Sequence, residues 1–71
     1  MTEMTFVARK DAYDPASETI SFGSTLNEVY VKAHTILENA NRDHELFEIA
    51  QTDAAGVVMA YKGTVSWEPK R

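Results

Sequence analysis

The chain has 71 residues, no cysteine and a formal net charge of −4, with 44% hydrophobic and 25% charged residues. This composition is typical of one folded domain over residues 1–71, and the lack of cysteine excludes disulfides and thiolate zinc sites. An acidic surface gains no affinity for a nucleic-acid backbone through counterion release, so direct nucleic-acid binding is disfavoured.

The N-terminal third predicts a β-hairpin. Residues 4–10 and residues 18–23 alternate between apolar and polar side chains, which is typical of strands. Between them, Asp14-Pro15 favours a turn because proline biases the preceding residue away from helix. The expected cross-strand pairs are Phe6 with Phe22, Ala8 with Ile20, and Lys10 with Glu18.

A helix is predicted from Thr25 to about Asn41. Thr25 and Glu28 match the S/T-x-x-E capping box that begins helices, and Glu28 with Lys32 makes a favourable i,i+4 pair. Val31 projects away from the apolar face, either as an isolated surface residue or as a contact for a partner. Apolar residues recur at the spacing of one helical face, which is expected to pack on a sheet: Leu26, Val29, Tyr30, Ala33, Leu37 and Ala40.

Residues 47–67 predict a long hairpin. A three-residue loop, Ala54-Ala55-Gly56, keeps the apolar sets of both strands on one side, with Gly56 left-handed and Asp53 at the first turn position. The residues expected to face inward from the second strand are Val57, Met59, Tyr61, Val65 and Trp67. The expected pairs are Ile49 with Tyr61, Gln51 with Met59, Glu48 with Lys62, and Phe47 with Gly63.

The element order is therefore β-β-α-β-β, an α+β two-layer domain with a four-stranded antiparallel sheet and one helix packed on one face. Residues 69–71 are expected to fray. The opposite face of the sheet is left with mildly apolar residues, among them Val7, Ala50, Val58 and Ala60. Open antiparallel sheets often expose such residues without consequence; the alternative is a surface for a dimer or for another protein.

Catalytic and ligand-binding signatures are not evident. His34 and His44 have no partner residue at a spacing that indicates a catalytic or metal site. The three glycines form no phosphate-binding motif. We therefore expect a protein that is not an enzyme and binds no metal or cofactor. Four acids lack the spacing of a calcium loop and indicate either solvated charge or an anionic patch for Arg or Lys of another protein: Asp43, Glu45, Glu48 and Asp53.

The segment GVVMAYKGTVSW, residues 56–67, resembles the closing strands of certain small phage-encoded anti-CRISPR proteins, which share the β-β-α-β-β order. In those proteins a strand, a short turn, an Ala-Tyr-Lys-like tripeptide and a late tryptophan follow a single helix. The resemblance implies a noncatalytic inhibitor that binds and blocks a CRISPR surveillance complex. The acidity of this chain departs from that pattern, since some such inhibitors use lysines to contact the complex.

These features predict a noncatalytic protein-binding module, in its most specific form a phage or mobile-element inhibitor of a bacterial defence complex that acts by steric block. The expected partner is a protein with a basic surface, and the alternative is a homodimer or larger homo-oligomer that self-associates through the outer sheet face. A cytoplasmic location is expected because the N-terminus lacks signal-peptide features and no apolar run approaches the ~18 residues of a membrane span. The candidate interface residues are Val7, Val31, Glu48, Val58, Ala60 and Lys62.

Overall fold

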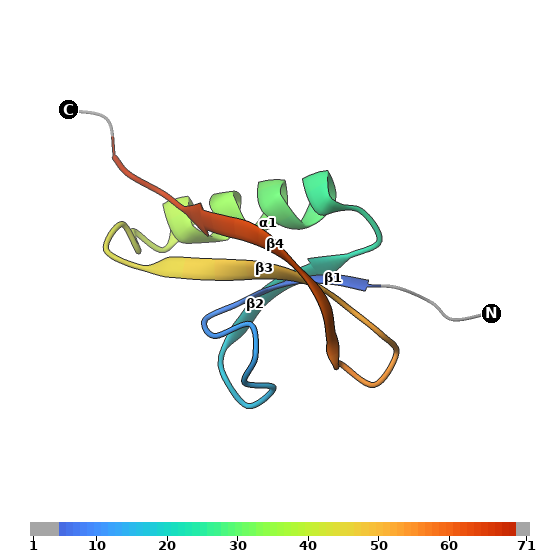
Figure 1. Cartoon of the computed structure of the whole chain (residues 1–71). Helices are drawn as coiled ribbons and strands as arrows, with labels where there is room; N and C mark the ends of the chain where they lie inside the picture. Colours follow the sequence, from blue (N-terminus) through green and yellow to red (C-terminus); the bar gives the residue numbers. More distant parts are fainter. Residues whose placement is uncertain (1–4, 70–71) are drawn as a thin grey trace.

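The chain forms one antiparallel sheet and one helix in a computed structural model that describes residues 5–69 (Figure 1). The strands lie in the order β2-β1-β3-β4 and α1 covers one face of the sheet, so the predicted α+β fold is confirmed. The expected strand residue Met4 and the expected fray at residues 70–71 lie outside the described residues. The elements in chain order are β1 (Thr5–Arg9), β2 (Thr19–Gly23), α1 (Leu26–Asn39), β3 (Leu46–Thr52) and β4 (Val58–Ser66).

Helix α1 begins and ends close to where its sequence indicates. The Thr25 side chain accepts a hydrogen bond from Glu28 N at 3.2 Å, which satisfies one of the free donors of the first turn. At the other end, Asn41 has a φ of 54° and Arg42 N donates to Leu37 O at 2.9 Å. This left-handed C-terminal cap ends the helix slightly before the predicted residue.

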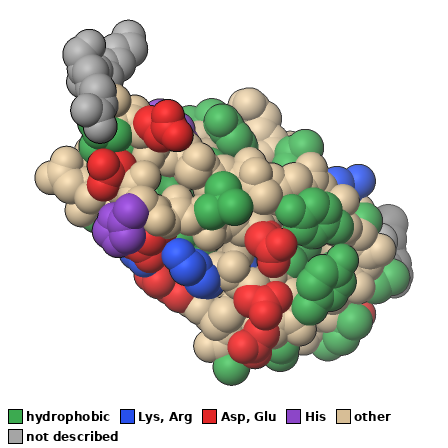
Figure 2. All heavy atoms as spheres, turned by 60° about the vertical axis from the view of Figure 1, so that its left-hand side comes forward, with side chains coloured by type: hydrophobic (Ala, Val, Ile, Leu, Met, Phe, Trp, Pro, Cys, Tyr) green, Lys and Arg blue, Asp and Glu red, His purple; other side chains and the backbone are tan. Residues whose placement is uncertain are grey.

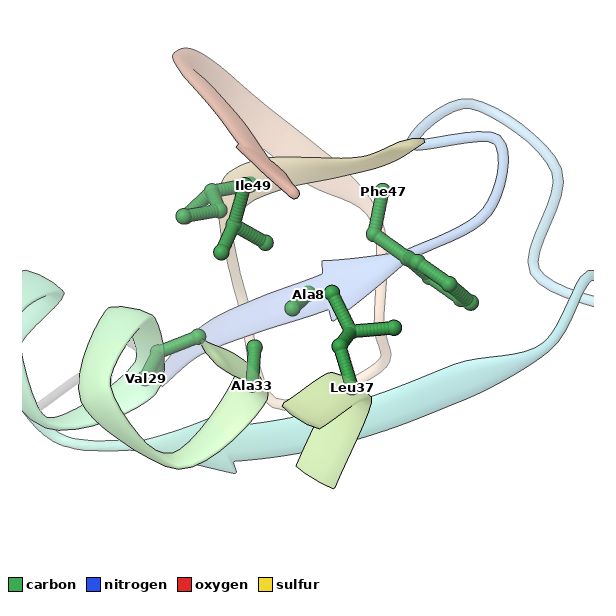
Figure 3. Packing of buried hydrophobic residues seen from close by; sticks show 7 residues of the cluster. Ala8, Val29, Ala33, Leu37, Phe47 and Ile49 are labelled. Carbon is green, nitrogen blue, oxygen red and sulfur yellow. The ribbon is translucent and has the colours of Figure 1, made fainter. Parts of the chain in front are cut away.

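The core lies between α1 and the sheet. Figure 3 shows the helix side chains pointing toward those of β1 and β3. Trp67 packs against the margin of this core, whereas Leu26 and Tyr30, at the N-terminal end of the predicted helical stripe, are exposed. The buried cluster consists of Ala8, Val29, Ala33, Leu37, Phe47, Ile49 and Val65.

The loop between β3 and β4 has the predicted three-residue form. Asp53 N donates to Val57 O at 3.0 Å, and Gly56 N donates to Asp53 O at 3.0 Å. Gly56 has the expected left-handed backbone, with a φ of 85°. The Asp53 carboxylate fixes the loop further, because its Oδ1 accepts hydrogen bonds from Ala55 N and Val57 N.

Beyond this loop, the pairing of β3 with β4 differs from the expected register. The observed pairs include Thr52 with Val58, Gln51 with Ala60, Ala50 with Tyr61, Ile49 with Gly63, and Phe47 with Val65. Met59 and Lys62 are therefore extra residues, or β-bulges, and each moves the pairing by one residue. The four expected pairs are wrong for this reason: Ile49 with Tyr61, Gln51 with Met59, Glu48 with Lys62, and Phe47 with Gly63.

The two bulges change which residues of β4 are buried. Tyr61 pairs with Ala50 on the face opposite α1, and Met59 and Tyr61 are 55% and 46% exposed. The expectation that both lie under the helix is wrong, because side-chain alternation holds only along an uninterrupted ladder. After the second bulge the expected orientation returns: Val65 is buried and Trp67 packs against the core.

The β1–β2 hairpin contains a bulge of its own. Ile20 is the extra residue, and Phe22 consequently lies on the face opposite α1, where it is 67% exposed. At the end of the hairpin, Lys10 N donates to Glu18 O at 2.7 Å, which confirms that these two residues meet. The observed pairs are Phe6 with Gly23, Val7 with Phe22, Ala8 with Ser21, and Arg9 with Thr19, so the expected pairs Phe6 with Phe22 and Ala8 with Ile20 are wrong.

Candidate functional site

The sheet face opposite α1 presents exposed aromatic and aliphatic side chains. Figure 1 shows the β1–β2 and β3–β4 loops extending on this side of the sheet. We call the surface formed by Tyr13, Val57, Val58 and Tyr61 the outer face. Tyr13, Val57 and Tyr61 are 68%, 58% and 46% exposed. Aromatic residues are enriched in protein interfaces, so this composition is suited to contact with another protein.

The β1–β2 loop is fixed onto the sheet. Ala12 N donates to Glu48 Oε1 at 2.8 Å, and Ala12 itself is fully buried. From β1, Arg9 Nη1 donates to Ala12 O at 3.1 Å. Val7 and Ala50, near the middle of the sheet, are buried although α1 covers only the other side. The outer face therefore has a packed floor and not a bare sheet.

Local hydrogen bonds hold the exposed part of the same loop. Tyr13 N donates to Asp11 Oδ1 at 3.1 Å, and Ala16 N donates to Asp14 Oδ1 at 2.9 Å. The Ser17 hydroxyl donates to Asp14 O at 2.8 Å. Such side-chain-to-backbone bonds stabilise a turn without a strand partner. They fix the backbone of the loop that carries Tyr13.

A cleft of about 290 Å³ lies between the two loops. One wall comes from Tyr13 and Pro15 of the β1–β2 loop. The opposite wall comes from residues 55–58 of the β3–β4 hairpin, and Arg9 lines the cleft from β1. Segments that are about 40 residues apart in the sequence are thus brought together by the pairing of β1 with β3 and by the hydrogen bond from Ala12 N to Glu48.

Three of the predicted interface residues belong to the outer side of the sheet. Val58 pairs with Thr52 and lines the cleft, half-buried. Val7 is 7% exposed and is not accessible to a partner. Glu48 is half-buried and its carboxylate holds Ala12, so it does not form the expected pair with Lys62.

The other three predicted interface residues lie elsewhere. Ala60 pairs with Gln51 on the α1 side of the sheet, because the bulge at Met59 inverts its orientation. Lys62 is exposed and lines a hollow beside Leu26 and Tyr30 of α1. Val31 is 52% exposed on α1 itself. The six residues do not form one surface.

Val31 belongs to a separate apolar groove between α1 and the edge strand β2. The groove has a volume of about 410 Å³ and is lined by Ile20, Phe22, Val31 and Ile36, with Lys32 and Thr35 at its polar positions. Residues 21–23 pair with β1 on one side only, because β2 is at the edge of the sheet. The contact role considered for Val31 therefore corresponds to a surface distinct from the outer face.

An ion-pair network joins the hairpin end of β1 and β2 to the start of β3. Arg42 donates to both oxygens of Glu18, at 2.8 and 2.7 Å, and also to Glu45. Lys10 Nζ donates to Glu45 Oε1 at 3.2 Å. Lys10 and Arg42 both lie over the ring of buried Phe47, at 4.9 and 5.2 Å from its centroid. The network closes one end of the core and uses two of the chain's few cations.

The hydrogen bonds of Arg42 shift the pKa of both carboxyl groups in this network. They hold the pKa of Glu45 at about 2, with a further contribution from Lys10, and they lower the pKa of Glu18. The same two carboxylates raise the pKa of Arg42, which therefore stays protonated. The network is a structural feature of the fold, since all four charges are paired with one another.

Figure 2 shows separate hydrophobic and acidic patches on the visible face, where lysine and arginine are confined to small areas. Within residues 5–69, Lys10, Lys32 and Arg42 are in ion pairs with carboxylates. By contrast, four carboxylates around the outer face form no ion pair in that part of the chain: Asp11, Asp14, Glu48 and Asp53. These four carboxylates outnumber Arg9, the cation on the same side of the sheet, so the charge around the outer face is negative on balance.

The two histidines are in ordinary surroundings. His34 is half-buried and stacks on Tyr30, with ring centroids 6.3 Å apart. His44 is exposed beside Asp43, with Nδ1 3.7 Å from Oδ1. No group of three or more His, Cys, Asp or Glu side chains suited to a metal ion occurs among the described residues. The described residues contain no helix that is long and apolar enough to cross a membrane.

Sequence reasoning missed Tyr61 and Arg9 as residues of this site. A signal for Tyr61 exists, because a glycine inside a strand, here Gly63, often marks a bulge that changes which side chains face the core. Arg9 carries no comparable signal. Its burial depends on the β1–β2 loop folding back over β1, which only the tertiary structure reveals.

Comparison of the chain with protein-family models, with curated proteins and with solved structures finds no match.

Proposed function

We propose that the protein is a noncatalytic binding module that contacts a partner protein through the outer face. The observation that supports this most directly is the exposure of Tyr13, Val57 and Tyr61 on one side of a well-packed sheet. Leaving such side chains in water forgoes the free energy of burying them, which binding to another protein recovers. The unpaired carboxylates around them favour a partner with a basic surface.

In its narrower form, the proposal is that the partner is a bacterial defence complex of the CRISPR type and that binding blocks it sterically. This form draws on the resemblance of residues 56–67 to anti-CRISPR proteins. The acidic outer face suits it, because surveillance complexes expose basic surfaces to hold nucleic acid. Such an inhibitor needs no catalytic group, since occupying the surface is sufficient.

The test combines purified CRISPR surveillance complexes of several types with the protein and follows binding of target DNA by mobility shift. We expect at least one complex to lose DNA binding, and association to slow as salt is raised. The variant Val57→Ser/Tyr61→Ser should abolish inhibition. The variant Val31→Ser, a similarly exposed site on α1, should retain it. Failure with every complex contradicts the narrower form, and full inhibition by the double variant contradicts the use of the outer face.

Self-association is the second candidate function. Residues 21–23 of the edge strand β2 carry no charged side chain, and Phe22 is 67% exposed there. Edge strands that lack charges can pair with another chain. Sedimentation velocity over a range of protein concentrations tests this candidate: an obligate oligomer shows no monomer at micromolar concentration, whereas an inhibitor that binds a different protein sediments as a monomer.

A further inference from the structure

The cleft of the outer face has a buried cation at its base. Arg9 is only 7% exposed and lines the cleft. Its Nη1 donates to Ala12 O at 3.1 Å and its Nε donates to Thr19 Oγ1 at 3.4 Å. A guanidinium has five N–H donors, so these two bonds leave donors over.

The remaining donors of Arg9 have no acceptor among residues 5–69. Nη2 makes no hydrogen bond to any described residue. Glu48 is the cross-strand neighbour of Arg9, but its Oε1 accepts from Ala12 N, and the two side chains form no ion pair within residues 5–69. Every fully enclosed polar side-chain atom of those residues has a hydrogen-bond partner, so Nη2, which has none, must reach solvent. The hollow that Arg9 lines is the cleft. A guanidinium donor that reaches solvent is available to an acceptor that a ligand supplies.

Two acidic residues adjoin the walls of the cleft along the chain. Asp14 lies between Tyr13 and Pro15, which form one wall, and Asp53 begins the hairpin loop that forms the other. One oxygen of each carboxylate accepts backbone hydrogen bonds, and neither residue forms an ion pair with a described cation. These two carboxylates repel a free anion that approaches the cleft, whereas they attract a basic molecule that carries a neutral carbonyl.

We propose that the cleft binds an extended segment of a basic partner protein. In this arrangement a backbone carbonyl of the segment accepts a hydrogen bond from Arg9 Nη2. An apolar side chain of the segment packs between Tyr13 and Val57, and flanking Lys or Arg residues lie beside Asp14 and Asp53. The inference rests on the proposed function, protein binding through the outer face, and adds the recognition chemistry of the site.

The test uses the full chain to select from a phage-displayed library of random twelve-residue peptides. We expect the selected peptides to contain Lys or Arg on both sides of an apolar residue. For a synthetic copy of the best peptide, Tyr13→Ser and Val57→Ser should each raise the dissociation constant by about tenfold or more, because each removes an apolar wall of the cleft. Val31→Ser is the matched control and should leave the constant unchanged, since it changes an exposed valine on α1.

The role of Arg9 is tested with Arg9→Lys, which keeps the charge but removes the free guanidinium donor. Circular dichroism checks that this variant folds, and peptide binding should again fall by about tenfold, the effect of one charge-assisted hydrogen bond. Movement of the Arg9 Nε–H resonance of the native protein during peptide titration gives a readout that does not depend on a folded variant.

Three results overturn the inference. Selection of acidic peptides would show that an anion binds Arg9. Loss of peptide binding in Val31→Ser would place the site at the α1–β2 groove. In that second case the proposed protein binding stands, but the cleft is not the binding site. Selection of no peptide shows that the cleft does not hold an extended segment. The surveillance-complex experiment judges the proposed function independently of all three.

Discussion

The bulged register of β4 predicts that Tyr61 and Val65, two apolar residues of the same strand, contribute very differently to stability. Val65 is 2% exposed in the core, whereas Tyr61 is 46% exposed on the outer face. Removing two buried carbons in Val65→Ala costs ~1.6 kcal/mol in transfer free energy, and the cavity raises this to ~2–3 kcal/mol. Tyr61→Ala leaves no internal cavity and should cost ~0.5–1 kcal/mol.

Urea unfolding followed by the fluorescence of Trp67, the one tryptophan of the chain, measures both effects. Trp67 packs against the core, so its emission reports on the tertiary structure. A domain of this size has a free energy of unfolding of ~4–11 kcal/mol and an m-value of ~1 kcal/mol/M in urea. We expect the midpoint to fall by ~2–3 M for Val65→Ala and by under ~1 M for Tyr61→Ala.

Uniform alternation along β4 makes a different prediction, because it buries Tyr61 under the helix. A fully buried aromatic residue costs ~3–5 kcal/mol on truncation to alanine. Equal destabilisation by the two substitutions, or greater destabilisation by Tyr61→Ala, would therefore contradict the bulges at Met59 and Lys62. Circular dichroism of each variant before unfolding controls for a change of fold.

Three further predictions concern charge and backbone conformation. The pKa of Glu45 is lowered from 4.5 to about 2, and that of Glu18 is also lowered. Their contribution to stability is therefore present above pH ~5 and is lost as the pH falls toward 2. Glu45→Gln should reduce this loss of stability, as measured by thermal melts at a series of pH values. Gly63 has a φ of 140°, and no neighbouring atom would contact a Cβ at this position. Gly63→Ala should therefore destabilise by ~1–3 kcal/mol through backbone strain alone, as read from urea midpoints. Asn41 has a φ of 54° at the helix cap, so Asn41→Ala should lower the melting temperature while Asn41→Gly preserves it, and equal melting of the two would contradict the left-handed cap.

Local signals in the sequence were sufficient for the elements of this fold. The capping box of Thr25 and Glu28 and the loop closed by Asp53 and Gly56 each depend on residues within five positions of one another. Such interactions form in the same way in many folds, so residue type and spacing predict them well. The order β-β-α-β-β and the packing of α1 on one face follow from these elements and their apolar patterns.

The register could not be predicted to the same degree. Bulges at Ile20, Met59 and Lys62 each insert one residue, and one residue is enough to exchange the two faces of a strand. Whether a bulge forms depends on the twist and packing of the whole sheet and not on the residue that bulges. Gly63 offered the one local indication, and it bears on the bulge that places Tyr61 outside the core.

The candidate site was the least predictable part, because its residues come from distant segments. The cleft joins Arg9 and Tyr13 to residues 55–58, and the ion-pair network joins Glu18 to Arg42 and Glu45. Strand alternation assigns residues to a face, but it does not show that Val7 is buried on the face opposite α1 or that the Glu48 carboxylate accepts a hydrogen bond from Ala12 N. Those facts follow from long-range contacts that leave no periodic pattern in the sequence.

The most direct test of binding through the outer face is an amide NMR titration of the ¹⁵N-labelled full chain with the best basic peptide from the library. We predict that the resonances of Tyr13, Val57 and Tyr61 shift together in proportion to occupancy, while those of Val31 on α1 stay in place. Shifts confined to α1 and β2, or no shift at saturating peptide, would contradict the assignment of the outer face as the binding surface.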